Sequence, residues 1–339
     1  MAFEEHHPGS EAPLSSPEAE LYHDRSTGLA IFGVMTIGLG CLSGLFVPLA
    51  IFGQAMSASV THEPTDFTLI LPALCIYGVL AVALIWLGIG SVLARRWARA
   101  LLLIFSWSWL ALGVVEIVAM SYILPKTLAN LPANGTDNQP ALTGAAIDGV
   151  LVGMFVVLGV VFVIMPGAWT FFYSSRHVKA TCDARSPGAT WTDACPLPVL
   201  AICLWGMFSV PMMVVMPIVG HGVAPFFGIF LTGWTGTLFY FFLAALWITA
   251  VWLMYRLDVR GWWLLLIALG IGMVSMLITL SQHNMLEMYR LMHYPEAQIE
   301  QIQKSGLLEG NSLMWMSAIW FVPFLGYLWF IKRYFRSEG

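Results

Sequence analysis

Four ionisable side chains stand within or beside long apolar stretches of this sequence, where a charged group is costly to bury. Glu116 and Asp148 fall inside apolar runs, and His221 and His283 stand at the ends of two others. Carboxylate and imidazole groups at membrane depth typically carry protons or cations. The four are therefore predicted to line an outward-facing polar cavity. The alternative for Glu116 is a hydrogen bond to a neighbouring Ser, Trp or Tyr side chain.

Helix-breaking residues form a second candidate feature. Pro211 and Pro217 fall within one apolar run, and the next run contains TGWTGT at residues 232–237. Proline removes a helical hydrogen bond, and broken helices at membrane depth mark substrate sites in transporters. The alternative is close packing, which the GxxxG spacing of Gly40 and Gly44 also favours. The threonines expected to satisfy freed carbonyls along such a path are Thr232, Thr235 and Thr237.

The elements that must position these residues are membrane-spanning helices. Of 339 residues, 59% are hydrophobic and 10% are charged, whereas globular proteins carry about 25% charged residues. Eight apolar runs are each long enough, at about 1.5 Å per residue, to cross a hydrocarbon core of about 30 Å. They are apolar on every face, which excludes the alternating strands of a barrel. The expected spans are 28–53, 67–93, 100–124, 146–174, 197–219, 226–255, 262–282 and 312–331.

Basic residues predict the orientation of these spans, because Lys and Arg resist translocation and gather in cytoplasmic loops. With the N-terminus inside, every Lys and Arg among the 15 falls on the cytoplasmic side except Lys126, Arg290 and Lys304. The fold class is therefore an all-α polytopic membrane protein of about eight helices, with both termini in the cytoplasm. The LARRWARALLLI stretch at 93–104 is then a cytoplasmic turn with a topology anchor; a phosphate or lipid-headgroup site is the less favoured alternative.

The chain also shows a pattern typical of an internal repeat. The turn YRLDVRGWWLLLI at 255–267 resembles the turn at 93–104, and each is followed by a longer outer loop and one more span. Four helices plus four in parallel orientation is the predicted plan. The expected regions are a disordered acidic cytoplasmic tail at 1–27, a first half at 28–174, a cytoplasmic connector at 175–196, a second half at 197–331 and a basic tail at 332–339.

The outer segment 283–306 predicts two short amphipathic helices. Met285, Met288 and Met292 recur at helical spacing, and Pro295 suits the first turn of a second helix. An interfacial cap is the favoured interpretation. A lid over a pathway and a docking face for a protein partner are the alternatives.

The five cysteines predict neither a disulfide nor a metal centre. Cys182 and Cys195 fall in the cytoplasmic connector, where a reducing compartment argues against a structural bond between them. A metal set that recruits His177 with Asp183 or Asp193 would lack the paired CxxC spacing of structural zinc sites. No metal site and no cofactor are expected.

Several function classes are argued against by missing motifs. No histidine lies deep in a span for haem, no HExxH, GxSxG or Walker loop is present, and no span carries several arginines. No catalytic residues, no enzyme activity and no nucleic-acid partner are expected. The function is expected to be that of a small-solute or ion transporter or channel in the lipid bilayer. The alternative is a non-transporting accessory, scaffold or sensor subunit, and the oligomeric state is left open.

Four stretches carry a resemblance across nearly the whole chain. RSTGLAIFG enters the first span, RRWARAL forms the first basic turn, WTDACPLPVL leads into the fifth span and MYRLMHYPEAQIEQ lies in the outer segment. Together these resemble uncharacterised bacterial multi-pass membrane proteins. The resemblance implies a bacterial inner-membrane location, and it implies no substrate, cofactor or catalytic residue.

Overall fold

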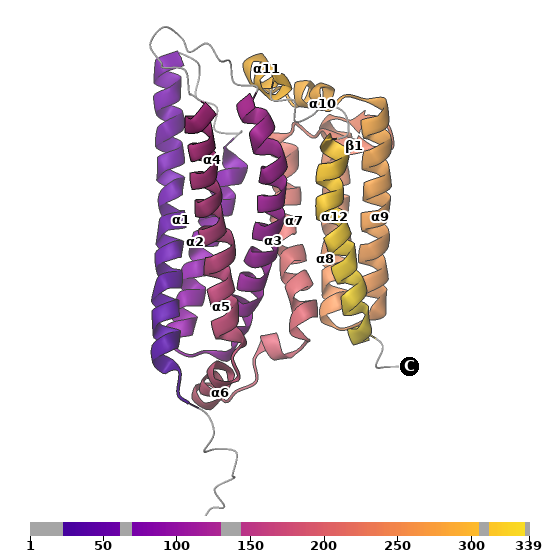
Figure 1. Ribbon diagram of the computed structural model, residues 1–339. Helices are drawn as coiled ribbons and strands as arrows, with labels where there is room; N and C mark the ends of the chain where they lie inside the picture. Colours follow the sequence, from indigo (N-terminus) through magenta and orange to yellow (C-terminus); the bar gives the residue numbers. More distant parts are fainter. Residues whose placement is uncertain (1–22, 62–69, 130–143, 305–311, 336–339) are drawn as a thin grey trace, which may run out of the picture.

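The computed structural model describes residues 23–61, 70–129, 144–304 and 312–335, and these form a bundle of long, roughly parallel helices (Figure 1). Seven helices in these ranges are each long and apolar enough to cross a membrane. The chain is therefore an all-α, multi-pass membrane protein. The expected eighth span coincides with helix α12 (Ser312–Ile331). The described side chains of that helix begin at residue 321, so the count of eight stays a prediction.

The first half of the chain forms the helices of one side of the bundle. Three elements make up its last span, because the π-helical turn η1 directly precedes Pro166, which has no backbone N–H to continue the regular α pattern. The bounds are α1 (Ser26–Thr61), α2 (Leu71–Val92), α3 (Arg96–Ala129), α4 (Gly144–Gly159), η1 (Val160–Ile164) and α5 (Met165–Ser174).

The second half follows a short connector that contains one surface helix. The connector holds α6 (Arg176–Arg185) and the 3₁₀ turn η2 (Trp191–Asp193). The remaining elements are α7 (Leu197–Val219), β1 (Ala224–Phe226), β2 (Ile229–Leu231), α8 (Gly233–Tyr255), α9 (Val259–Gln282), α10 (Met285–Leu291), α11 (Glu296–Lys304), α12 and the 3₁₀ turn η3 (Lys332–Phe335).

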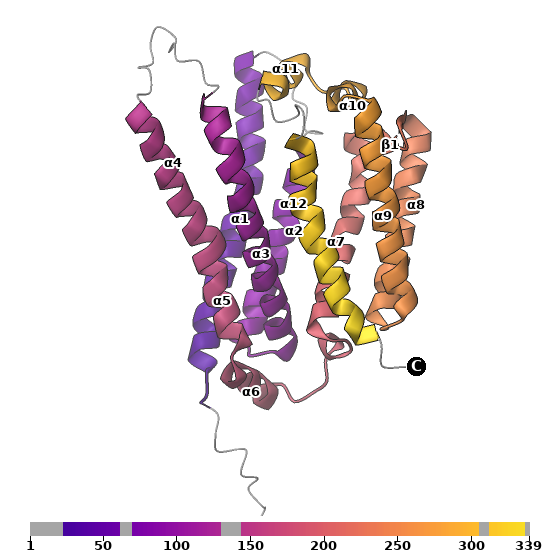
Figure 2. The same cartoon turned by 45° about the vertical axis from the view of Figure 1, so that its right-hand side comes forward.

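The two ends of the bundle differ in what covers them. At one end, here called the basic end, α1 begins, α2 turns into α3, α6 lies across the bundle and α12 finishes (Figures 1 and 2). At the opposite end, here called the hairpin end, lie the β1–β2 hairpin, α10 and α11. This grouping is the one that the basic residues predict for the cytoplasmic and outer sides. Which end faces the cytoplasm stays a prediction.

Glycines let α1 and α2 approach each other closely in the first half. A side chain at Gly88 would meet the Gly33 carbonyl oxygen at 2.7 Å, and one at Gly40 would meet the Ala81 carbonyl oxygen at 3.0 Å. A side chain at Gly44 would lie 3.6 Å from the Ala81 Cβ, which is an ordinary van der Waals contact. Since small residues let backbones approach in a membrane, close packing accounts for the GCLSG stretch.

Each half also has its own core near the basic end. In the first, Ser91 Oγ lies 2.7 Å from the Tyr173 hydroxyl and donates to the Leu29 carbonyl at 3.0 Å, which joins α2, α5 and α1. In the second, the fully buried Trp262 donates its indole N–H to the Leu328 carbonyl at 2.8 Å, which joins α9 to α12. Buried partners of this kind keep each sub-bundle together without any charge at depth.

The halves meet along a narrow seam, where α3 lies beside α7 and α12, and α2 also contacts α7. The Trp205 indole donates to the Ser108 hydroxyl at 2.8 Å across this seam. Within each half the neighbours follow the same order, since α1–α2 and α2–α3 pack together as α7–α8 and α8–α9 do. Superposition of residues 28–174 on 197–331 would test the predicted repeat, which stays a prediction.

The structure corrects the sixth predicted span. Residues 226–232 were expected to be helical, but they form part of a two-stranded hairpin, and α8 begins only at Gly233. Gly228 and Gly233 have φ of 85° and 59°, outside the helical region. The helix that follows is continuous to Tyr255, so TGWTGT marks the start of α8 and not a break within it.

Candidate functional site at the hairpin end

A tight hairpin closes the end of the bundle between α7 and α8. Its strands pair antiparallel with Phe226 opposite Ile229, and Phe227 and Gly228 form the two-residue turn with φ of 43° and 85°. Positive φ at both central residues is the conformation that matches the twist of the flanking strands. The aromatic side chain at the first turn position is unusual, since L-residues other than Asn, Asp and Gly rarely adopt positive φ.

Two polar side chains of helix α9, and the histidine that directly follows the helix, hold this turn. The Phe227 N–H donates to Ser275 Oγ at 2.9 Å, and the Gly228 N–H donates to Thr279 Oγ1 at 3.0 Å. His283, one turn further, lies with Nε2 3.0 Å from the Gly228 carbonyl oxygen. Spacing of four residues puts Ser275 and Thr279 over one another on the helix surface, and His283 follows directly after the last residue of α9. Ser275 and Thr279 are buried, so the turn of the hairpin is fastened at its tip.

His283 is also paired with a carboxylate. Its Nδ1 lies 3.0 Å from Glu287 Oε2, while its Nε2 faces the Gly228 carbonyl. Both partners are acceptors only, and a neutral imidazole has one N–H. The doubly protonated imidazolium is therefore the form that donates to both partners at once. Glu287 belongs to α10, so this histidine joins α9, the hairpin and α10.

The other corner of the hairpin depends on contact between two glycines. Gly222 adopts φ of 69° and lies against the start of α8, where a side chain on Gly236 would collide with the Gly222 carbonyl oxygen. The Tyr240 hydroxyl, one turn further along α8, donates to the Val223 carbonyl at 3.2 Å. The two ends of the α7–α8 connection are thus held by backbone contact that only glycine permits.

Helix α10 packs on the hairpin, and α11 follows α10 at the same end of the bundle (Figures 1 and 2). Met288 and Met292 pack on Val223, with Phe230 and Tyr294 at the edge of this small core. Together the hairpin, α10 and α11 form what is called here the cap. Two short helices within 283–306 were expected from the sequence, and the structure has both.

Two histidines face each other at the surface of the cap. The rings of His221 and His293 lie edge to face with centroids 4.8 Å apart. Each follows the end of a helix, α7 for His221 and α10 for His293, and each adopts positive φ. Of the candidate residues from the sequence, His221 and His283 are therefore brought to the same cap, but they have different partners.

Two of the predicted threonines bond to carbonyl groups at the start of α8. Thr235 Oγ1 donates to the Thr232 carbonyl at 2.8 Å, and Thr237 Oγ1 donates to the Gly233 carbonyl at 2.9 Å, all within the first turns of α8. Pro211 and Pro217 lie inside α7, which is assigned as one helix over its full length despite both prolines.

Glu116 and Asp148 belong to the other half of the bundle. Glu116 is half-buried on α3, and the structure gives it no hydrogen bond or ion pair within the described ranges. It follows Arg96 by 20 residues, so at about 1.5 Å per residue it lies about 30 Å further along the axis, near the opposite boundary of the hydrocarbon. Asp148 lies in α4, and its side chain is outside the described part. The predicted cavity of four ionisable groups is not assembled among the described side chains.

A second polar cluster ties three segments together at the basic end. Arg96 Nε lies 2.8 Å from Asp183 Oδ1 and its Nη2 lies 3.7 Å from Asp193 Oδ1, which joins α3 to α6 and η2. The backbone N–H of Thr190, with help from its hydroxyl and from Arg96, holds the pKa of Asp193 below its usual value. Arg96 is thus a structural ion-pair partner of the connector, and so more than a topology signal.

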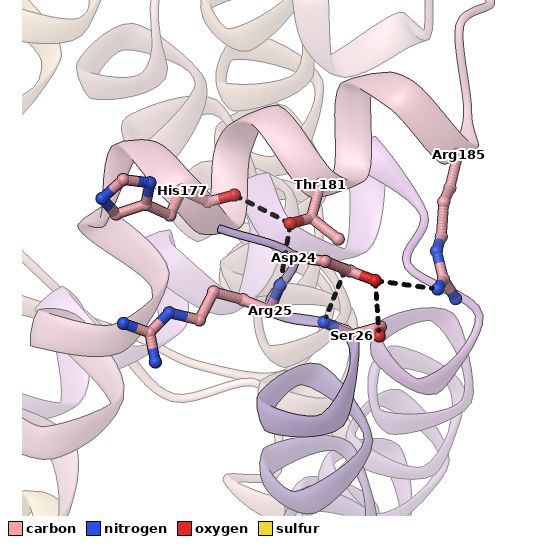
Figure 3. Close-up of polar contacts among 6 residues, drawn as sticks. All are labelled: Asp24, Arg25, Ser26, His177, Thr181 and Arg185. Atoms are coloured by element: carbon pink, nitrogen blue, oxygen red, sulfur yellow. Dashed lines mark hydrogen bonds and ion pairs between the residues drawn. The ribbon is translucent and has the colours of Figure 1, made fainter. Parts of the chain in front are cut away.

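The segment before α1 docks on α6 in the same region (Figure 3). The Arg25 N–H donates to Thr181 Oγ1 at 3.1 Å, and Thr181 in turn donates to the His177 carbonyl at 2.9 Å. Asp24 accepts from the Ser26 N–H at 3.0 Å and lies 3.4 Å from Arg185 Nη2. The Ser26 N–H is the main cause that lowers the pKa of Asp24. Asp24 therefore caps the start of α1 while anchoring it to the connector.

The two connector cysteines are buried thiols. Burial raises the pKa of Cys182 and of Cys195 to about 11 each, so both are protonated near neutrality and are poor nucleophiles or metal ligands. No group of three His, Cys, Asp or Glu side chains within the described ranges is arranged to hold a metal ion. Cys182 packs in the first core with Val178 and Tyr173.

Sequence reasoning missed the residues that build the cap, namely Ser275, Thr279, Glu287 and His293. A signal for part of this set exists, because Ser275, Thr279 and His283 recur at intervals of four within an otherwise apolar run. That spacing indicates a polar stripe on one helix face. The sequence does not indicate that the stripe binds a β-turn.

Comparison with known proteins adds no relative: no family model matches the chain, and no curated protein and no solved structure is similar to it.

Proposed function

We propose that this multi-pass membrane protein is a non-transporting sensor or accessory subunit, whose helices hold the cap at the outer surface of the bacterial inner membrane. The observation that carries the proposal is how the polar side chains of α9 and of the residue that follows it are used. Ser275, Thr279 and His283 all bind the hairpin turn instead of facing a path through the bundle. Side chains that hold the cap in a fixed conformation are suited to binding a partner or ligand at the hairpin end. No enzymatic step is assigned to this surface.

The separation of Thr235 and Glu116 supports the proposal. A path that uses both residues needs them on one cavity wall. Thr235 lies in α8, which packs against α7, α9 and the hairpin, whereas Glu116 lies in α3, whose neighbours include α2, α5, α7 and α12. Thr235 and Glu116 therefore do not serve as one cation site in the proposed function.

The pairing of buried polar side chains is a second support. The eight buried Ser and Thr side chains in the described ranges all make a hydrogen bond to protein except Thr170, whose hydroxyl has no partner there. Satisfied hydroxyls are typical of packed helices, whereas a water-filled path needs groups left free for solvent or substrate. One unpartnered hydroxyl on α5 is too little to build a path.

Transport of a small solute or ion is the second candidate, and the seam between the halves favours it. The halves share few contacts along α3, α7 and α12, and rocking of one helical half against another is the usual motion of alternating access. A substrate path would then run along the seam, past Ser108 and Trp205. The two candidate functions therefore predict opposite water accessibility at Ser108.

Water accessibility of Ser108 distinguishes the candidates. Ser108 is about 18 Å along α3 from Arg96, near the middle of the hydrocarbon. In a variant without the five native cysteines, Ser108→Cys is treated with a membrane-impermeant maleimide from either side. Ser106→Cys on the same helix is the matched buried control, and Asn284→Cys on the exposed cap is the positive control.

The proposed function predicts that Ser108→Cys reacts as slowly as Ser106→Cys, while Asn284→Cys reacts readily from the outer side. Rapid reaction of Ser108→Cys from either side would establish a water path along the seam and would replace the sensor by the transporter. Labelling of Asn284→Cys from the cytoplasmic side would overturn the orientation on which both candidates rest.

A further inference from the structure

The histidine pair of the cap is the feature that the proposed function leaves unexplained. His221 and His293 come from segments 72 positions apart in the chain, yet their rings lie edge to face with centroids 4.8 Å apart. Both side chains are exposed at the hairpin end. Within the described ranges, this mutual contact is the only side-chain interaction that the structure gives either ring. Four ring nitrogens are thus free to bind something from solution.

We propose that His221 and His293 together bind a late divalent transition-metal ion, with Cu²⁺ bound most tightly. Neutral imidazole is a preferred ligand of Zn²⁺, Ni²⁺ and Cu²⁺, and the affinity of a given nitrogen site rises toward Cu²⁺ in the series of divalent ions. Two imidazoles would occupy neighbouring positions of the ion, and water would fill the others. Such an open site suits a sensor that must bind and release its ion.

The ring separation fits a shared ion. A metal–nitrogen bond of about 2.0–2.1 Å puts each ring centroid about 3.2 Å from the ion, so an angle of about 90–110° at the ion separates the centroids by about 4.5–5.2 Å. The observed separation of 4.8 Å lies within this interval. The separation of the two ring centroids is therefore compatible with one shared ion.

The backbone at both positions is held before any ion arrives. On the α7 side, the Gly220 N–H donates to Met216 and the Gly222 N–H donates to Pro217, which closes the helix around His221. On the α10 side, the His293 N–H donates to the Arg290 carbonyl at 2.9 Å. Preorganised ligands lose little conformational entropy when the ion binds.

The electrostatic surroundings also favour a cation. His221 and His293 each lie two residues beyond the last residue of a helix, α7 and α10, and the helix dipole places a partial negative charge at that end. The nearest basic residue in sequence is Arg290, and its guanidinium lies 3.9 Å from Glu296 of α11. The ion would join the end of α7 to the end of α10 and so fasten the cap to the bundle.

Substitution by glycine tests the site without disturbing the fold. His221 and His293 have φ of 50° and 59°, a region that glycine adopts freely, so His221→Gly and His293→Gly remove the imidazole while relieving the backbone. His283→Gln is the matched control, since it removes a histidine of the same cap outside the pair. His6 and His7 are replaced by Asn in every variant, because an adjacent histidine pair also binds copper.

The measurement is Cu²⁺ binding to the full chain in detergent micelles, by titration calorimetry and by electron paramagnetic resonance. The expected result is one ion with the spectrum of two nitrogen ligands, an affinity at least about tenfold lower in each glycine variant, and no change in His283→Gln. Unchanged binding in either glycine variant, or loss of binding in His283→Gln alone, would overturn the proposal.

The inference rests on the proposed function only in placing the cap in water. Failure of copper binding would leave the maleimide labelling of Ser108→Cys unaffected, and labelling that supports transport would leave a copper site on the cap in place. A melting curve for each glycine variant checks folding independently, since both are expected to melt at or above the temperature of the parent.

Discussion

Thr279→Val should loosen the hairpin more than any other conservative change in α9. Thr279 is 2% exposed, and its Oγ1 accepts the Gly228 N–H at 3.0 Å while donating to the Ser275 carbonyl at 2.8 Å. Valine has nearly the same shape but leaves the buried Gly228 N–H without a partner. A buried donor without an acceptor costs about 1–3 kcal/mol, and about 1.4 kcal/mol is a tenfold change in an equilibrium constant. Local opening of the turn should therefore become about 5- to 140-fold more frequent.

Amide hydrogen exchange of peptides that cover residues 224–231 measures this opening directly. The matched control is Thr249→Val in α8, because Thr249 makes the same bond to the carbonyl four residues earlier, at 2.8 Å, without holding any other segment. The control should leave exchange of 224–231 unchanged. If Thr279→Val accelerates exchange of these peptides no more than Thr249→Val does, the hairpin is not fastened by α9 and the description of the cap is wrong.

Two further changes test the packing of the first half and of the connector. Gly88→Ala should destabilise the protein by about 1–3 kcal/mol relative to Gly78→Ala on the same helix, because the new methyl meets the Gly33 carbonyl oxygen at 2.7 Å whereas Gly78 faces open space. The gain in helix propensity is the same in both variants and cancels in the comparison. Unfolding in mixed micelles measures the difference in stability, and equal stability of the two variants would contradict the α1–α2 contact. Burial raises the pKa of Cys182 from 9.0 to about 11. The reference is an exposed cysteine introduced by Ala184→Cys in a Cys182→Ser background, and at pH 7 the thiolate fraction of Cys182 should be about 100-fold smaller than that of the reference. Alkylation of Cys182 should therefore be slower than alkylation of the reference cysteine by at least about 100-fold. The same shift means that the contribution of this thiol to the free energy of unfolding is fully present below pH 9 and is lost as pH rises toward 11. Cys182→Ala should therefore lower the melting temperature less at pH 10 than at pH 8, and an equal or larger effect at pH 10 would contradict the sign.

The helical membrane class and most span boundaries followed from hydropathy, because an apolar run of membrane length has no other stable conformation in lipid. The predicted span 197–219 coincides with α7, and the predicted span 312–331 coincides with α12. The sixth span was predicted seven residues too early, since Phe226, Phe227, Ile229, Phe230 and Leu231 are as apolar as a helix would be. Hydropathy measures the tendency to leave water and does not distinguish a buried hairpin from a helix.

The chemistry of the candidate site shows the same division. His221 and His283 stood out in the sequence as ionisable groups at the ends of apolar runs, and both lie in the cap. Their partners, His293 and Glu287, were visible only as part of an amphipathic segment. Which of these side chains form pairs depends on where α10 packs against the bundle, and the local sequence does not determine that position.

The sequence alone therefore determined that this chain is a helical, multi-pass membrane protein, because hydropathy sums over single residues and does not depend on which segments meet. The positions of its basic residues predict which end faces the cytoplasm. Tertiary packing alone decided which polar side chains meet. Ser275 and Thr279 would hydrogen-bond only within their own helix if no turn approached, and 72 positions of chain must fold back before two imidazole rings come within 4.8 Å. Contacts between distant segments depend on the arrangement of all the helices at once, and that arrangement is a property of the folded bundle.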